Sequence, residues 1–339
     1  MVVAKKKDRP QNLHDRAFKA LFSPPEAALP ILRAALPPAL IDAIDPGSLV
    51  PGPTDFVNDE LEEDHRDLLL SATIKGQHAL FYFVEHQSTV QRFMSLRLLR
   101  YVLKVWDWWL AQHPKATTVP AVIPVVLHQG HKAWDQPRAL QELIDLPREA
   151  LDLVGRHLPG LDFALLDLGP ASKAELAAFP GPPLVRVTLV FMRAIVDPRY
   201  DPLDALELLR SELRQLMVLP GGKARVKVVL RYTVRARPEL DVRRVADEFR
   251  RVAGDEAGEV VMSTAHELIE TGRAQERREL LEAQLTEKFG KLAPAVLERL
   301  SAASAEQLKT WAIRFATVKR LEDVFADRRR PGSRRSRKK

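Results

Sequence analysis

Short apolar runs alternate with stretches of helical spacing over the first half of the chain. A helix is expected over residues 89–112, between the second and the third of the four main strands given below. A further short strand is expected at 55–57, inside a connection over 46–60 that is rich in Pro, Gly and Asp. The order helix, strand, strand, strand, helix, strand predicts an α/β core. Its main strands are expected at 66–75, 78–88, 120–127 and 162–168.

Helical spacing dominates the rest of the chain. Two helices, 14–22 and 25–36, are expected ahead of the strands, the second with a favourable early proline. A linker over 254–258 separates the main domain from a small helical module. Further helices are expected at 183–196, 203–217, 222–234 and 242–252. The predicted parts are a basic leader (1–12), a main domain (13–250), a helical accessory module (260–326) and a basic tail (327–339).

The net charge of +7 is concentrated in the two ends of the chain. Residues 5–9 contribute +3 and residues 328–339 contribute +8, which leaves −4 on the body between them. Basic runs of this kind attract polyanions without reading their sequence, and they also serve solubility alone. Nucleic-acid contact is therefore expected at the tails, with simple solvation as the alternative.

Composition excludes several kinds of chemistry. The chain has no cysteine, which rules out disulfides, thiolate zinc sites and a cysteine nucleophile, and fits a reducing cytoplasm. Its most apolar stretch, 184–196, is interrupted by arginines and falls short of the roughly 18 residues of a membrane span. Residues 1–12 lack the apolar core of a secretory leader. We expect a soluble, cytoplasmic protein that does not bind membranes.

The predicted hairpin over 67–87 carries an acidic residue near each outer end. If Gly76-Gln77 is the turn, Asp67 falls opposite Glu85 or His86, with opposed Cβ atoms roughly 4.5–5.5 Å apart. Two carboxylates held this close repel each other, and burial raises the cost. A divalent cation between them removes the repulsion, so the hairpin predicts a metal site. The alternative is that both carboxylates lie at strand ends and face water.

Oxygen donors near the hairpin suit a hard cation such as Mg²⁺, with Mn²⁺ or Ca²⁺ as substitutes. Asp67, Glu85 and the backbone carbonyl of His86 could form the ligand set. Gln87 shares a strand face with Glu85, so it would point towards the attacking water. The His86 side chain points to the other face, where a hydrogen-bonded core histidine is expected.

Other polar residues have weaker claims to a site. His14 and Asp15 begin the first predicted helix, where an acidic residue could approach the metal. A helix cap explains them better, because Asp near a helix start satisfies free N–H groups and offsets the dipole. His128, Gln129 and His131 follow the third main strand and are expected to form a polar loop.

One face of the predicted helix over 89–112 is basic. Arg97, Arg100 and Lys104 share this face, and with Tyr101 beside them they could follow a phosphate backbone. A solvated outer face explains the same pattern equally well. Tryptophans 106 and 109 on this helix fit core packing better than base stacking.

Four segments carry a resemblance to a known family. They are His14-Asp15 with Phe18-Lys19, the hairpin segments RDLLL and FVEHQS, the run FMSLRLLRYV, and IPVVLHQG with Trp134. Over roughly residues 13–250 the chain resembles the Rpn family of recombination-promoting nucleases, also called YhgA-like putative transposases. This family lies within the PD-(D/E)XK nuclease superfamily. The helical region at the end resembles a small module often attached to these proteins.

The resemblance implies a restriction-endonuclease-like core, with a mixed sheet flanked by helices and a mostly helical C-terminal part. It also implies Mg²⁺-dependent DNA endonuclease activity, with Asp67 and Glu85 as metal ligands. Gln87 stands where the superfamily usually has a catalytic lysine, a departure common within the family itself. His65-Arg66 and His128 replace residue types that are more frequent in the family, and both acidic residues are retained.

The rival interpretation is a non-catalytic DNA-binding or assembly protein that keeps the nuclease fold. The absence of the lysine at Gln87 favours it. Retention of Asp67 and Glu85 favours catalysis, because a pure binder has no need of two facing carboxylates that repel phosphate. DNA is the expected partner in either case, and the sequence leaves open whether the protein forms a homo-oligomer.

Overall fold

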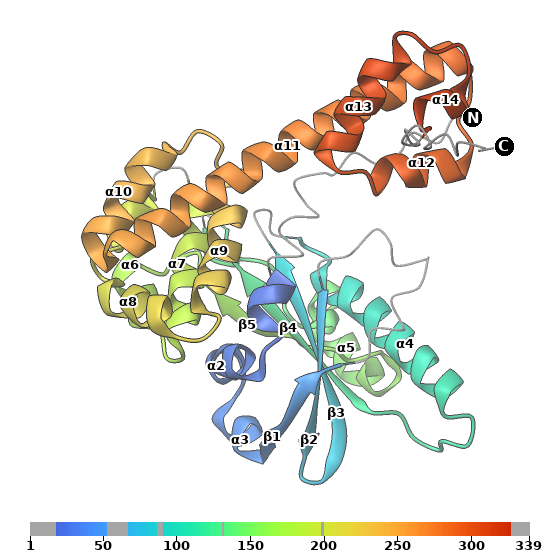
Figure 1. Cartoon of the computed structure of the whole chain (residues 1–339). Coiled ribbons are helices and arrows are strands. Elements are labelled where there is room, and N and C mark those ends of the chain that lie inside the picture. Colours follow the sequence, from blue (N-terminus) through green and yellow to red (C-terminus); the bar gives the residue numbers. More distant parts are fainter. Residues whose placement is uncertain (1–17, 53–66, 87–90, 131, 198–199, 327–339) are drawn as a thin grey trace, which may run out of the picture. The chain divides into compact units, whose positions relative to one another are not determined.

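A five-stranded mixed sheet is the centre of the first of two compact units, Met1–Thr264 and Ala265–Lys339 (Figure 1). The computed structural model describes residues 18–52, 67–86, 91–130, 132–197 and 200–326. The first two pairs of neighbouring strands are antiparallel, and the last two pairs are parallel. In spatial order the strands are β1 (Ile44–Pro51), β2 (Asp67–Ile74), β3 (Gln77–His86), β4 (Ala121–His128) and β5 (Ala164–Asp167).

This sheet confirms the α/β class and the four main strands expected from the sequence. The β2–β3 hairpin, however, turns at Lys75-Gly76 and not at Gly76-Gln77. Ile74 pairs with Gln77, and the two loop residues have φ values of 47° and 79°. A two-residue hairpin loop favours this left-handed pair because its twist matches that of the strands, and Gly76 adopts it without steric cost.

Strand β1 was not expected from the sequence, because it contains Pro46-Gly47-Ser48. Its pairing with β2 is interrupted by a bulge between Asp45 and Val50. Within the bulge, Asp45 Oδ1 accepts a hydrogen bond from Gly47 N at 2.9 Å, and Ser48 Oγ accepts one from Thr73 N at 2.7 Å. Proline is tolerated because β1 is an edge strand. The strand expected at 55–57 lies outside the described residues.

One face of the sheet belongs to the larger apolar cluster, which α2 (Pro25–Ala35) joins directly and which continues into a group of further helices. The helices that contribute to this cluster are α2, α7 (Pro183–Val196), α8 (Arg210–Val218), α9 (Gly222–Ala236) and α10 (Val242–Ala253). The sheet contributes Leu68, Leu70, Phe81, Val125 and Leu127 to the cluster. The extent of α7 matches the sequence prediction, whereas the helix expected at 203–217 consists of a 3₁₀ turn, Pro202–Ala205, followed by α8.

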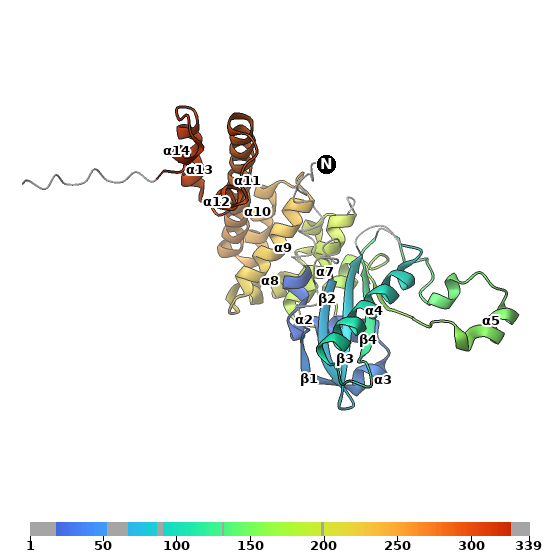
Figure 2. The ribbon, with the colours of Figure 1, turned by 90° about the vertical axis from the view of Figure 1, so that its right-hand side faces the viewer.

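The opposite face is covered by one long helix, α4 (Met94–Gln112), which crosses the strands in Figure 2. Its buried residues Met94, Leu98, Tyr101 and Val105 pack against Leu69, Leu80, Val126 and Phe163. The remaining short helices of this unit are α3 (Pro38–Ala43), α5 (Arg148–Val154), α6 (Lys173–Ala177) and the 3₁₀ turns Leu140–Leu143 and Gly155–His157. No helix in the described ranges has the length and apolar character needed to cross a lipid bilayer.

The second unit is helical and has a core of its own, to which Leu281, Leu285, Leu308 and Trp311 belong. Its elements are the end of α11 (Asp255–Phe289), α12 (Pro294–Ser301), α13 (Ala305–Phe315) and α14 (Leu321–Val324). The expected linker at 254–258 is wrong, because α11 begins directly after Gly254, whose φ of 93° ends α10. The second glycine, Gly258, lies inside α11, where a Cβ would meet the Ala246 carbonyl oxygen at 3.0 Å.

Candidate active site

Strands β2 and β3 bring the two predicted metal-ligand positions to the same end of the sheet. Asp67 is the first residue of β2 and pairs with Val84, and Glu85 follows Val84 on β3. The prediction that Asp67 lies opposite Glu85 or His86 is therefore wrong, because the hairpin turns one residue earlier than expected. The two acidic positions are still on neighbouring strands, close to the outer end of the hairpin.

The side chains of Asp67, Glu85 and His86 are outside what the structure describes, as are all atoms of Gln87, His14 and Asp15. Their predicted roles in metal binding, water positioning and accessory contact stay predictions. Among the described residues there is no cluster of three or more histidine, aspartate or glutamate side chains that could hold a metal ion.

Strands β4 and β5 end beside β3 and add two further polar residues. The parallel registers place His86 next to His128, and His128 next to Asp167. His128 is fully buried, with its Nε2 4.0 Å from Asp167 Oδ1 and 3.1 Å from the carbonyl oxygen of Lys132. Because a carbonyl can only accept, the latter hydrogen bond requires a proton on Nε2. Its ring meets Trp134 edge-on, with centroids 5.2 Å apart.

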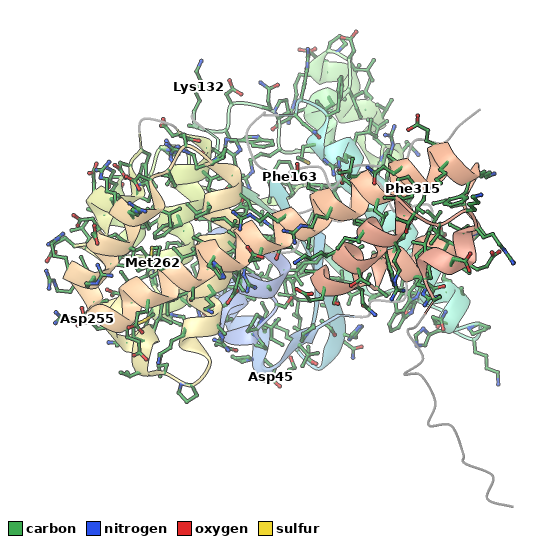
Figure 3. The ribbon with its side chains drawn as sticks, turned by 45° about the horizontal axis from the view of Figure 1, so that its top comes forward. Asp45, Lys132, Phe163, Asp255, Met262 and Phe315 are labelled. Carbon is green, nitrogen blue, oxygen red and sulfur yellow. The ribbon has the colours of Figure 1, made fainter. Side chains whose placement is uncertain are left out.

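Asp167 holds the loop after β4 against the end of β5. Its Oδ2 accepts a hydrogen bond from Trp134 N at 2.7 Å, and its Oδ1 accepts one from Gly169 N at 2.9 Å. The backbones come so close that a Cβ on Gly169 would lie 2.4 Å from the Lys132 carbonyl oxygen. Figure 3 labels Lys132, which is exposed on this loop. The Asp167 carboxylate therefore joins the loop after β4 to the segment after β5 through hydrogen bonds.

The sequence prediction missed Asp167 and misjudged the loop. His128 and Gln129 are both fully buried, so the start of the loop is a packed part of the sheet end and not a solvated turn. His131 lies outside the described residues. One signal in the sequence was the spacing Asp167-Leu168-Gly169, since an aspartate commonly accepts a hydrogen bond from the backbone N–H two residues ahead.

Helix α7 supports this end of the sheet from the larger core. The buried Arg193 donates to the carbonyl oxygen of Gly169 at 3.1 Å and to Asp197 Oδ2 at 3.3 Å. Its guanidinium lies 5.8 Å from the ring centre of Tyr200. Burial raises the pKa of Tyr200 to about 12, although the positive charge of Arg193 acts in the opposite direction. The loop after β5 is thus hydrogen-bonded to the buried guanidinium of Arg193 through the Gly169 carbonyl.

The predicted DNA-binding residues lie on α4. Arg100 and Lys104 are exposed, whereas Tyr101 is only 6% exposed and packs in the core between α4 and the sheet. Arg97 is half-buried, with its guanidinium 5.7 Å from the Tyr101 ring centre and its Nη1 3.3 Å from Gln91 Oε1. The three basic residues therefore reach the surface, while Tyr101 is a core residue whose ring lies beneath Arg97.

The tryptophans of α4 make mainly local contacts. Trp106 is half-buried and donates from Nε1 to the Pro120 carbonyl oxygen at 2.9 Å. Trp109 stacks on His113, with ring centroids 3.9 Å apart, and on His78 at 5.3 Å. These contacts fix the end of α4 to the sheet and agree with a packing role.

The sequence matches the family model described as "Putative transposase, YhgA-like" over residues 12–219. Recombination-promoting nuclease RpnD of Escherichia coli O157:H7 is 31% identical over 203 residues, which are 60% of this chain and 68% of that protein. Recombination-promoting nuclease RpnA of E. coli K12 is 30% identical over 118 residues, 34% of this chain and 40% of RpnA.

Some similar proteins carry a different description. The inactive recombination-promoting nuclease-like protein RpnE of E. coli K12 is 30% identical over 118 residues, 34% of this chain and 39% of RpnE. No solved structure matches the chain. The family match covers more than half of the chain and includes both predicted metal-ligand positions. The chain therefore belongs to the YhgA-like putative transposase family, together with the Rpn recombination-promoting nucleases.

Proposed function

We propose that this protein is a metal-dependent endonuclease that hydrolyses phosphodiester bonds in DNA, in the manner suggested by the names of RpnD and RpnA. The observation that carries the proposal is the placement of Asp67 and Glu85 on adjacent strands at one end of the sheet. A role in DNA recombination is part of the same proposal, since the relatives are named for it.

The residues at this sheet end fit a hard divalent cation. Asp67, Glu85 and the backbone carbonyl of His86 offer oxygen ligands, which Mg²⁺, Mn²⁺ and Ca²⁺ prefer over nitrogen or sulfur. The strands that carry them are paired up to these positions, β2 with β3 and β3 with β4, so the backbone is held on both sides of Glu85. When bound, the cation would stabilise the negative charge that develops on the phosphate.

Gln87 is assigned to the attacking water. Its amide can donate a hydrogen bond to that water or to a phosphate oxygen and can accept one from the water, but it supplies no positive charge. A lysine would supply that charge, so this site relies on the cation and on basic residues elsewhere. We assign phosphate contact to Arg97 and Lys104 on α4, and to the basic tail. Arg100 lies on the same helix beside the exposed side chains of Leu96 and Leu103.

A second function is favoured by two observations. Gln87 replaces the usual lysine, and two relatives of similar identity are named inactive or putative inactive. The chain would then bind DNA or assemble with other proteins without cleaving it. Titration calorimetry with Mg²⁺ or Mn²⁺ separates the two, because a pure binder gives no site-specific heat.

Incubation with supercoiled plasmid, with and without Mg²⁺, tests the proposal directly. We expect nicked or linear DNA only in the presence of the cation. A preparation that binds plasmid but leaves it supercoiled at every Mg²⁺ and Mn²⁺ concentration contradicts the proposed activity and supports the binder.

A further inference from the structure

Helix α4 carries an apolar stripe on its outer side, away from the sheet. Leu96, Leu103 and Leu110 follow one another at seven-residue intervals and are 36%, 47% and 43% exposed, and Phe93 beside them is 58% exposed. Large apolar side chains scattered singly on a surface need no explanation, whereas an aligned set on one helix marks an interaction site.

The stripe has the spacing of a helix–helix interface. With Leu96, Leu103 and Leu110 at one core position of a heptad, Leu99 and Trp106 occupy the other, and both are half-buried. Apolar residues in this alternation of three and four present a continuous seam to a neighbouring helix. The seam runs from Leu96 to Leu110 along most of the 19-residue helix, a length of about 22 Å at 1.5 Å per residue.

The seam is separate from the face that α4 uses inside its own unit. Met94, Leu98 and Val105 are fully buried against the sheet and form a second apolar face with the same spacing. A surface helix with one partner needs one apolar face and is polar on the other side. Helix α4 has two, and the structure shows a partner for only one of them among the described residues.

Charge complementarity identifies the partner. Arg100 and Asp107 flank the seam on the same side, are exposed, and form no ion pair with another described residue. Each occupies the position immediately after the core residue Leu99 or Trp106. In an antiparallel pair of helices these flanking positions face each other across the seam.

We propose that two copies of this chain associate through α4 in an antiparallel, twofold arrangement. Leu103 then packs against the partner copy's Trp106, and Leu99 against its Leu110. Arg100 faces Asp107 of the other copy, and the twofold axis repeats the ion pair, as self-complementary interfaces require. In a parallel pair the same two charged residues would instead lie opposite the flanking positions on the other side of the seam, which carry no charge.

The proposed interface does not use the other basic residues of the helix. Arg97 and Lys104 lie two turns apart, and neither is at a core or flanking position. The association does not depend on the proposed nuclease activity, because it uses no residue assigned to metal or water. It predicts a dimer whether or not the protein cleaves DNA.

Sedimentation velocity of the full chain, without DNA and over a range of concentrations, tests the proposal. The parent protein should be dimeric, and Leu103→Glu should raise the dimer Kd by at least about 100-fold, because it places a carboxylate in a buried apolar layer. Leu153→Glu, at a residue of α5 that is 81% exposed, is the matched control and should leave the dimer intact. Circular dichroism should show unchanged helix content in both variants.

A charge exchange tests the orientation. Arg100→Asp and Asp107→Arg should each weaken the dimer about 5- to 10-fold, because each creates two like-charge contacts by symmetry. The double variant should restore the parent Kd. A monomeric parent protein, or a dimer that Leu103→Glu leaves unchanged, overturns the proposed interface. Failure of the double variant to restore the Kd overturns the antiparallel arrangement.

Discussion

At one end of the sheet, the β4–β5 half and the β2–β3 half each present acidic residues at strand termini, in different settings. Asp167, which ends β5, accepts hydrogen bonds from the N–H groups of Trp134 and Gly169. Asp67 begins β2, and Glu85 lies on the neighbouring strand one residue beyond the Asp67–Val84 pair. The Asp167 carboxylate is hydrogen-bonded to the loops on either side of it. Asp67 and Glu85 are two acidic positions on neighbouring strands.

An acidic residue at a strand end is therefore not a functional residue by position alone. A carboxylate whose oxygens accept backbone N–H groups stabilises the fold, and its loss is felt as stability. Asp67 and Glu85 are not a directly opposed pair, and the role proposed for them is cation binding, so their loss should be felt as activity. Each half of the sheet end therefore predicts a different phenotype.

The largest expected effect follows removal of either proposed metal ligand. Asp67→Ala and Glu85→Ala should each reduce Mg²⁺-dependent plasmid nicking to background, because the remaining half-site holds the cation weakly. Thermal stability should change little, because the role proposed for both residues is in cation binding and not in packing. Nicking assays and melting curves on the same preparations measure both quantities.

Asp152→Ala is a suitable control for these variants, because its carboxylate is 65% exposed on α5 in a surface ion pair with Arg148. It should leave both nicking and melting unchanged. Full cleavage by Asp67→Ala or Glu85→Ala would remove the assigned residues from the site.

The next effect in size concerns Gln87. Gln87→Ala should lower single-turnover nicking at saturating Mg²⁺ by on the order of 10²–10³-fold, the scale for losing one preorganised donor. Gln87→Lys should keep or raise the rate, because it adds positive charge where negative charge develops. Metal affinity should change little in either variant. If Gln87→Ala cleaves like the parent, the residue is structural.

The Asp167 side of the comparison should appear as lost stability. Asp167→Ala leaves the N–H groups of Trp134 and Gly169 without their acceptor, which should lower the free energy of unfolding by about 2–4 kcal/mol. Denaturant unfolding measures the loss, with Asp152→Ala again expected within about 0.5 kcal/mol of the parent. If Asp167→Ala loses Mg²⁺ binding but keeps its stability, Asp167 belongs to the metal site. Its assignment as a structural residue would then be wrong.

The sequence was sufficient to locate the hairpin and its acidic residues, but not their register. Both Lys75-Gly76 and Gly76-Gln77 are plausible two-residue turns, and the correct one places a lysine at a φ of 47°. Such backbone is uncommon for a residue other than Gly, Asn or Asp, so composition points to the wrong dipeptide. A shift of one residue in the turn then changes every cross-strand pair.

The remaining errors arise where tertiary contacts override a local signal. Pro46-Gly47-Ser48 has the composition of a loop, yet it forms the bulge of an edge strand because Ser48 Oγ accepts from Thr73 N. Gly258 suggests a linker, yet it lies within a helix, at a point where a Cβ would approach the Ala246 carbonyl oxygen to 3.0 Å. Neither contact can be anticipated from neighbours in the sequence.

The smallest expected effect separates DNA affinity from chemistry at the sheet end. Deleting residues 328–339 removes a charge of +8 from a body that is formally acidic. Non-specific DNA affinity should fall, and the slope of log K against log salt should become shallower by up to about 0.9 for each phosphate that the tail no longer neutralises. Nicking at saturating DNA should persist, because the metal ligands are retained.

The salt series should be measured for Arg97→Ala and Lys104→Ala as well. Each substitution is expected to lower the number of neutralised phosphates by at most one. An unchanged slope in the deletion would show that the tail does not touch DNA, and would assign the phosphate contacts to the body of the protein.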